Sequence, residues 1–257
     1  EKRTGLPVYA VIPHSDKQKA LEKRSRGKNG SSAVLAVADV NDPAIEGLRS
    51  LRTAFQFAVL DVNNNLLLIT GVSPDVGKTF LSLNFGAVLA SSGKRVLVID
   101  ADLRRGHLTQ NLGIEQTGGL SEVIAGTCDV DQVVRETGVD NLEFVAAGVL
   151  PPNPSELLLH ENFARALQEF SDQYDHVIID SPPILAATDA GIIGRIAGAT
   201  FLVAKAGAHR LHEIEQSVKQ LRQAGVDLRG FVLNDVSRTS SPYTYGKYTT
   251  HAYAYKS

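Results

Sequence analysis

Short apolar segments alternate with amphipathic ones along most of this chain, and this alternation limits the possible folds more than any other feature. The apolar segments, which have the length of buried strands, are residues 66–70, 95–100, 141–146, 176–180, 200–205 and 230–233. The segments with helical spacing are residues 78–91, 155–170, 187–196 and 211–224. Strands joined by helical crossovers run parallel, and the helices cover both faces of the sheet. The sequence therefore predicts an α/β fold with a doubly wound, mostly parallel sheet.

A further helix is predicted before the first of these strands. Asp42 is a good N-cap and Pro43 suits a first turn, so the helix should begin there and run to about residue 60. Residues 1–41 are predicted to be a juxtamembrane linker, with a short docking strand at residues 5–9. Six Lys and Arg residues fall within residues 17–28, opposed by one Glu. Such a stretch would be attracted to anionic lipid, but it equally fits a solvated linker.

Composition excludes several classes of protein. The 257 residues carry 26 basic and 28 acidic side chains, which argues against a nucleic-acid partner. The one cysteine, Cys128, cannot form an intrachain disulfide framework and fits a reducing compartment. No apolar run approaches the roughly 18 residues of a membrane span. The chain begins at Glu1 and has no Met, so we expect it to be part of a longer protein whose other part could include membrane spans.

A glycine-bearing loop at residues 71–79, GVSPDVGKT, joins a predicted strand to a predicted helix. Backbone N–H groups in such a loop surround phosphate oxygens, and the helix N-terminus adds its positive end. Lys78 is expected to reach the β- and γ-phosphates of a nucleotide, and the Thr79 hydroxyl to bind Mg²⁺. The strict phosphate-loop spacing is not met, because Val72 occupies the place of the first Gly and Gly71 comes one residue early.

Acidic side chains end two of the apolar segments. Asp100, with Asp102 two residues later, follows RVLVI, and Asp180 follows HVII. Ligands of open parallel sheets bind at the carboxyl ends of strands, and a buried acid there needs a cation or hydrogen bonds. We therefore expect Asp180 to lie beside Mg²⁺, Asp100 to accept a proton from an incoming hydroxyl, and Asp102 to hold the metal through water. Asn234, at the end of GFVLN, either contacts an adenine edge or simply ends a strand.

Five of the seven tyrosines lie in the last fifteen residues, which have no apolar face to bury. Such composition favours a disordered end, so residues 237–257 are predicted to be a tyrosine-rich tail that follows the phosphate-loop domain at residues 42–236. The tail tyrosines are candidate sites of modification: Tyr243, Tyr245, Tyr248, Tyr253 and Tyr255. An extended tail of about twenty residues spans roughly 60 Å, enough to reach a neighbouring subunit.

In combination, these features resemble the bacterial tyrosine kinases, the cytoplasmic domains of inner-membrane polysaccharide co-polymerases that govern capsule and exopolysaccharide chain length. The resemblance covers nearly the whole chain and rests on GVSPDVGKTF, VLVIDADLRRG, VIIDSPP, EGLRSLR and the tyrosine tail. It implies a phosphate-loop ATPase fold like that of partition ATPases. It also implies transfer of the ATP γ-phosphate, with Mg²⁺, to tail tyrosines of a neighbour.

The resemblance further implies roles for individual residues and partners. Lys78, Asp100, Asp102 and Asp180 would be catalytic, with Thr79, Asp102 and Asp180 around the metal. The nucleotide would contact Ser73, Asp75, Val76, Gly77, Lys78, Thr79, Phe80 and Asn234, although an acid such as Asp75 must point away from it. Glu46, Arg49 and Arg52 would join subunits in a ring, typically an octamer; by spacing alone they suggest an ordinary ion pair within a helix. The implied partners are a membrane-spanning activator region and a cognate tyrosine phosphatase.

Two other functions fit part of the sequence. An ATPase switch of the partition and cell-division type shares the fold, but it carries a lysine five residues before the loop lysine, where this chain has Ser73. A ring-forming scaffold without enzymatic activity could use the tail as an interaction strip for a membrane polymerase. Incubation with ATP would distinguish the three functions. Phosphotyrosine would indicate the kinase, phosphate release without phosphotyrosine the ATPase switch, and neither product the scaffold.

Overall fold

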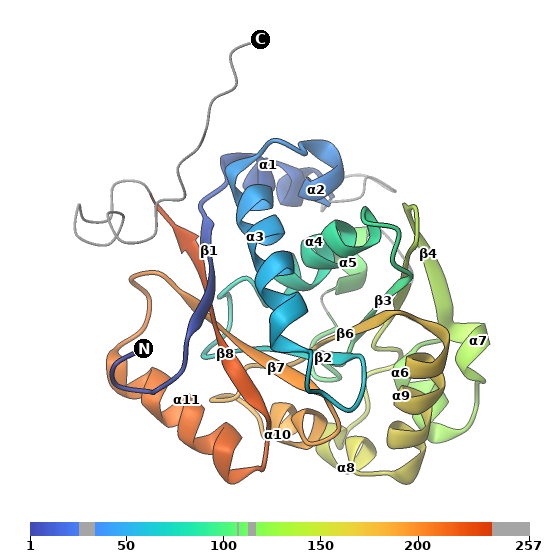
Figure 1. The fold of residues 1–257 in the computed structure, drawn as a ribbon. Helices are drawn as coiled ribbons and strands as arrows, with labels where there is room; N and C mark the ends of the chain where they lie inside the picture. The colour runs from blue at the N-terminus through green and yellow to red at the C-terminus, as the bar shows by residue number, and fades with distance from the viewer. Residues whose placement is uncertain (26–33, 107, 113–116, 238–257) are drawn as a thin grey trace.

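The protein, in a computed structural model, is described over residues 1–25, 34–106, 108–112 and 117–237 (Figure 1). Within these ranges eight strands form one sheet in the order β1-β8-β7-β2-β6-β3-β5-β4. The neighbouring strands are parallel, apart from the antiparallel pair β4 and β5. The predicted mostly parallel sheet is confirmed. The strands are β1 (Val8–Pro13), β2 (Leu66–Gly71), β3 (Val96–Asp100), β4 (Val134–Val139), β5 (Leu142–Val145), β6 (His176–Asp180), β7 (Ala199–Lys205) and β8 (Leu228–Val236).

Helices cover both faces of the sheet, as a doubly wound fold requires (Figure 1). Successive side chains of a strand point to opposite faces, so Leu67 and Ile69 of β2 join the core beneath α3 and α4, whereas Leu66 and Leu68 join the core on the other face. One face carries α3 (Pro43–Ala58) and α4 (Lys78–Ala90); the other carries α6 (Leu120–Ala125), α9 (Glu161–Gln173), α10 (Asp189–Gly194) and α11 (Leu211–Gln223). The shorter helices are α1 (Asp16–Ser25), α2 (Leu35–Ala38), α5 (Leu108–Leu112), α7 (Val130–Val133) and α8 (Pro154–Leu158).

Helix α3 begins where its capping residues predict. The Asp42 carboxylate accepts a 2.8 Å hydrogen bond from the Ala44 N–H, and Pro43 occupies the first turn. Apolar residues at helical spacing are buried along one stripe, namely Ile45, Leu48, Leu51 and Phe55. The helix ends at Ala58, two residues before the predicted end. This stripe packs against β1 and α4, and α4 in turn packs against β2.

The N-terminal segment contributes more structure than a linker does. Strand β1 begins at Val8, three residues after the predicted start of the docking strand, and pairs in parallel with β8. Its Ala10 and Ile12 are buried in the core beneath α3. Helix α3 approaches so closely that a Cβ on Gly47 would lie 2.9 Å from the Val11 carbonyl oxygen. Because β1 covers an edge of β8 that would otherwise present unpaired backbone groups, this segment is part of the domain.

Other differences from the predicted elements lie in short or polar segments. Strand β4 has a mostly polar sequence, VRETGV, and forms the antiparallel edge of the sheet. The single helix predicted over residues 155–170 is instead α8 followed by α9, because His160 adopts an extended backbone and caps α9. No helix of the described ranges is long and apolar enough to cross a membrane. Residues 238–257, including all five tail tyrosines, lie outside the described part of the chain.

Candidate functional site: a phosphate loop and buried acids

The loop between β2 and α4 has the shape of a phosphate cradle. Gly77 lies in the left-handed region at φ 91° and starts α4 without a side-chain cap, so the first N–H groups of this helix face the loop. The loop folds tightly over Gly71, where an added Cβ would lie 2.5 Å from the Val76 side chain. Exposed N–H groups and the positive end of the helix favour an anion here. Gly71 thus takes the role of the first glycine of the strict phosphate-loop pattern, which would be at position 72.

Thr79 and Ser82 of α4 both bind the carboxylate that ends β6. The Thr79 hydroxyl donates to Asp180 Oδ2 at 2.9 Å, and the Ser82 hydroxyl donates to Asp180 Oδ1 at 3.1 Å. The predicted proximity of Thr79 and Asp180 is therefore present in the structure. Ser82 was not predicted, although a polar residue three positions after Thr79 in an apolar helix shares the face of Thr79. The hydroxyl and carboxylate oxygens form a donor set that suits Mg²⁺.

Two buried acids share the end of the sheet. Asp100 of β3 is directly opposite Asp180 of β6, and both are at most 3% exposed. Burial raises the pKa of Asp180 to about 6, although the positive charge of Lys78 and the bonds from Thr79 and Ser82 act against this rise. Burial, and then the negative charge of Asp180, raise the pKa of Asp100 well above its ordinary value. Ionisation of either acid is therefore costly while no cation is bound.

Asp100 and Asp102 do not face the site in the same way. Asp100 accepts 3.1 Å bonds from the backbone N–H groups of Asp102 and Leu108, so it closes the loop that follows β3. Asp102 is half-buried, and its carboxylate accepts the N–H groups of Arg104 and Arg105 at 3.2 and 3.1 Å. In this conformation a phenol could reach Asp102 more easily than the enclosed Asp100. The proton-acceptor role of Asp100 remains a prediction.

Asn234 helps to hold the phosphate loop. Its amide donates a 2.9 Å hydrogen bond to the Val76 carbonyl, and its side chain lies where a Cβ on Gly77 would be. A cavity of about 170 Å³ opens beside it, lined also by Asp75, Phe80 and His14. Asp75 is exposed, in the left-handed region at φ 60°. The amide donor of Asn234 is committed to the loop, and its contact with adenine remains a prediction.

The three charged residues of α3 have partners within the chain. Arg49 donates to Glu46 Oε2 at 3.0 Å and to the Val40 carbonyl at 2.8 Å. Arg52 reaches α4, donating to the Val88 carbonyl at 3.3 Å. Glu46 and Arg49 are therefore a surface ion pair in the single chain, whereas Arg52 also helps to end α4. Their role in a ring remains a prediction.

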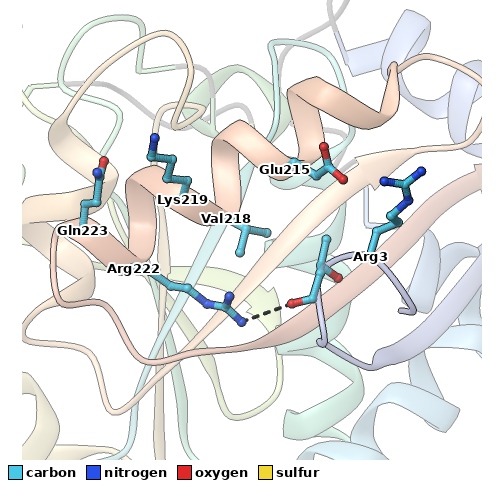
Figure 2. A pocket seen from close by; sticks show the side chains of 7 residues that line it. Arg3, Glu215, Val218, Lys219, Arg222 and Gln223 are labelled. Atoms are coloured by element: carbon cyan, nitrogen blue, oxygen red, sulfur yellow. Dashed lines mark hydrogen bonds between the residues drawn. The ribbon is translucent and has the colours of Figure 1, made fainter.

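A larger hollow of about 390 Å³ lies away from the phosphate loop, between α11 and the first residues of the chain (Figure 2). Arg222 crosses it to donate a 3.2 Å hydrogen bond to the Thr4 carbonyl. The hollow lies toward the C-terminal end of α11, which leads into the amino end of β8. The acids are at the carboxyl ends of their strands, so the hollow is at the opposite end of the sheet from them. Its lining mixes Arg3 and Lys219 with Glu215, and none of the predicted site residues is there.

The fold and the site together define a phosphate-loop, nucleotide-binding α/β domain. A family model described as an AAA domain matches residues 69–223, a range that includes the loop and all three strand-end acids. The septum site-determining protein MinD of Pyrococcus horikoshii, at 22% identity and a TM-score of 0.59, shares the fold.

Closer relatives identify the family. The kinase domain of the Escherichia coli tyrosine kinase ETK superposes with a TM-score of 0.86 at 40% identity, covering 99% of this chain and 97% of that one. The BceF tyrosine kinase domain gives 0.84 at 46% identity, covering 92% and 96%. The putative tyrosine-protein kinase EpsB of Ralstonia solanacearum is 44% identical over all of this chain. The chain therefore belongs to the bacterial tyrosine kinases. It spans 35% of the length of EpsB.

Proposed function

We propose that this chain is an ATP-dependent protein-tyrosine autokinase that phosphorylates its own tyrosine tail in neighbouring subunits. The observation that carries the proposal is the Thr79–Asp180 hydrogen bond, which joins the phosphate loop to the acid of β6 in a chain of this family. In the whole protein, a membrane-spanning region would anchor the domain on the cytoplasmic side of the inner membrane. There it would regulate capsule or exopolysaccharide polymerisation and export.

The phosphate loop would bind and orient ATP. Backbone N–H groups at the start of α4 would hold phosphate oxygens, and Lys78 would bring a positive charge to the β- and γ-phosphates. Thr79 and Asp180 have the oxygen donors to hold Mg²⁺, with Asp102 nearby through water. Bound Mg²⁺ would neutralise charge on the phosphate oxygens during transfer. Most of the rate enhancement then comes from positioning and charge.

Asp100 would accept the proton of the tyrosine hydroxyl. A free tyrosine has a pKa of about 10, so the phenol is neutral at pH 7. A carboxylate with a raised pKa is a stronger base than an ordinary one, which makes this transfer less unfavourable. Burial and Asp180 raise the pKa of Asp100 in the described state. Access of the phenol requires release of the Leu108 N–H from Asp100, and therefore an opening of the loop after β3.

The acceptor would come from another subunit. Glu46, Arg49 and Arg52 lie along one side of α3. If they exchange their contacts within the chain for contacts with a neighbouring subunit, a ring would form, with an octamer as the expected size. Ring formation would raise the local concentration of tail tyrosines at each site. A tyrosine phosphatase would restore the unphosphorylated tail.

Incubation with γ-labelled ATP and Mg²⁺, followed by tryptic mapping, tests the proposal. Label is expected on tyrosines 243–255, and Lys78→Met is expected to abolish it. Lys219→Met, which removes a lysine from the exposed surface of α11, is the matched control and should retain labelling. Release of phosphate without label on the wild-type chain would instead favour an ATPase switch, which the fold shared with MinD makes the second candidate. If neither label nor released phosphate is detected, a scaffold without enzymatic activity is the remaining candidate.

A further inference from the structure

A buried carboxylate outside the phosphate loop holds three separate segments together. Asp189, the first residue of α10, is fully buried. Arg104 donates to it through two nitrogens, Nε to Oδ2 at 2.8 Å and Nη2 to Oδ1 at 3.0 Å. Ser155 of α8 donates to Oδ1 at 2.6 Å and accepts from Arg104 Nη2 at 2.9 Å. Arg104 and Asp189 are 85 positions apart in the sequence.

This cluster begins in the turn that carries Asp102. The Asp102 carboxylate accepts the Arg104 and Arg105 N–H groups, and the Asp102 carbonyl accepts the Gly106 N–H at 2.8 Å. Any movement of the Arg104 backbone therefore moves the Asp102 carboxylate. The Arg104 side chain leaves this turn and ends on Asp189, so the position of Asp102 depends on where Asp189 is fixed.

The other end of the cluster leads to the phosphate loop. Asp189 follows Asp180 by nine residues, and the segment between them connects β6 to α10. Within that segment the Ile184 N–H donates to the Gly71 carbonyl at 2.9 Å, at the end of β2 where the phosphate loop starts. The Arg104–Asp189 bond thus connects the turn of Asp102 to a segment that also contacts the phosphate loop and carries Asp180.

The chemistry of the pair suits precise placement. A buried carboxylate is costly unless it is fully paired, and Asp189 is satisfied by a two-pronged guanidinium and a hydroxyl. Paired N–H donors to both carboxylate oxygens fix direction as well as distance. The Arg104 side chain is 41% exposed, so solvent weakens the charge attraction, and geometry is its main contribution.

We propose that Arg104 is a positioning residue for the kinase: by binding Asp189 and Ser155, it aligns Asp102 with the metal side of the phosphate loop. This inference rests on the proposed function, since it assigns Asp102 to that site. Because its guanidinium is bound to Asp189 and Ser155, we assign Arg104 no direct contact with the phosphates or the acceptor tyrosine. Loss of its bonds should therefore weaken the use of Mg²⁺ and slow transfer, while the nucleotide still binds the loop.

The test compares Arg104→Gln and Arg104→Lys with the wild-type chain. For Arg104→Gln we expect tail phosphorylation to fall about ten- to hundredfold and the half-saturating Mg²⁺ concentration to rise severalfold, as for other residues that support a metal ligand. Affinity for fluorescent ADP without Mg²⁺ should stay unchanged. Arg104→Lys keeps the charge but not the two-pronged geometry, so it should recover only part of the activity. Arg165→Gln, which breaks an exposed Arg–Glu pair on α9, should match the wild type.

Further variants decide whether the effect passes through Asp189. Asp189→Asn should reproduce the Mg²⁺ defect, and adding Arg104→Gln to it should cause no further loss. An unchanged Mg²⁺ dependence in Arg104→Gln, or independent losses in the double variant, would overturn the proposal. If the wild-type chain incorporates no label, the kinase function fails, yet the Mg²⁺ dependence of ADP binding still tests the role of Arg104. Thermal unfolding of each variant separates this defect from loss of folded protein.

Discussion

Asp100 and Asp180 lie directly opposite each other on the neighbouring parallel strands β3 and β6, and both carboxyl groups are buried. Two acids in this arrangement cannot both ionise at low cost without a nearby cation. In the described state Lys78 lowers the pKa of Asp180, but burial still raises it to about 6. The site is therefore prepared to bind a cation at some cost to the stability of the nucleotide-free domain.

The first prediction is that Asp180→Asn stabilises the nucleotide-free domain at pH 7. A carboxyl whose pKa is raised on folding destabilises the folded state above that pKa, and the penalty develops between about pH 4 and pH 6. The difference between 3.8 and about 6 corresponds to about 3 kcal/mol at most. Urea unfolding at pH 7 should show a higher free energy of unfolding for the variant, and the gain should vanish near pH 4.

A buried acid with a cation partner is the control for this prediction. Asp189 is equally buried, but it is bound by Arg104, so Asp189→Asn should lower the free energy of unfolding at pH 7. Mg²⁺-dependent nucleotide binding should be lost in Asp180→Asn. A lower stability of Asp180→Asn at pH 7 than at pH 4, relative to the wild type, would contradict the argument.

The second prediction concerns Asp75, an acid in the phosphate loop. Its φ of 60° is in the left-handed region, which costs an L-residue roughly 1–2 kcal/mol but an aspartate less. Asp75→Gly relieves this strain but gives the unfolded chain more backbone entropy, which opposes folding, so stability should change by less than about 1 kcal/mol. ATP should bind severalfold more tightly, because a negative charge is removed. Asp75→Asn, which keeps the shape and removes the charge, should show the same gain in a fluorescent-nucleotide titration; no gain in either variant would contradict this role of charge.

The third prediction uses the contact between Gly77 and Asn234. Gly77→Ala places a Cβ in the left-handed region and against the Asn234 amide, so it should displace the loop and abolish ATP binding. Asn234→Ala alone frees the Val76 carbonyl and should weaken binding less. The double variant removes the clash but keeps the backbone strain, so calorimetric titration should show binding recovered in part. Full recovery would mean that the backbone conformation of Gly77 is unimportant.

Local sequence signals predicted the elements that form the site. Strand β6 begins and ends as predicted, α3 begins at the predicted cap, and the ends of β2, β3 and β6 place the loop and the acids together. These features follow from apolar periodicity and capping within a few residues of each other. The polar edge strand β4 has no such pattern, because it lies at the edge of the sheet and Thr137 alone among its 6 residues is buried.

Long-range polar contacts could not be predicted in the same way. No local sequence signal links Arg104 to Ser155, and their common partner Asp189 is distant from both in the sequence. The pairing of β1 with β8 joins the two ends of the domain and has no local signal either. Such contacts depend on topology, which fixes the neighbours only after the strand order is known.

The fourth prediction separates ring contacts from contacts within one chain. Arg49 bonds to Glu46 and the Val40 carbonyl at the surface, so Arg49→Ala should change the free energy of unfolding by less than about 1 kcal/mol. Arg52→Ala also removes one of the two hydrogen bonds to the Val88 carbonyl of α4, the other coming from the Ser91 hydroxyl, so it should lower stability by about 1 kcal/mol in addition to any effect on assembly. Arg49→Ala is therefore the cleaner probe of assembly.

Light scattering after gel filtration provides the measurement. If α3 forms the ring contact, Arg49→Ala and Glu46→Ala should each shift the mass of the unphosphorylated chain from an oligomer to a monomer, with unchanged thermal unfolding of the monomer. Arg165→Ala, on the exposed surface of α9, should leave the oligomer intact. Oligomers that persist in both Arg49→Ala and Glu46→Ala would show that these charges form only the intrachain pair. Transfer between subunits would then require a different contact.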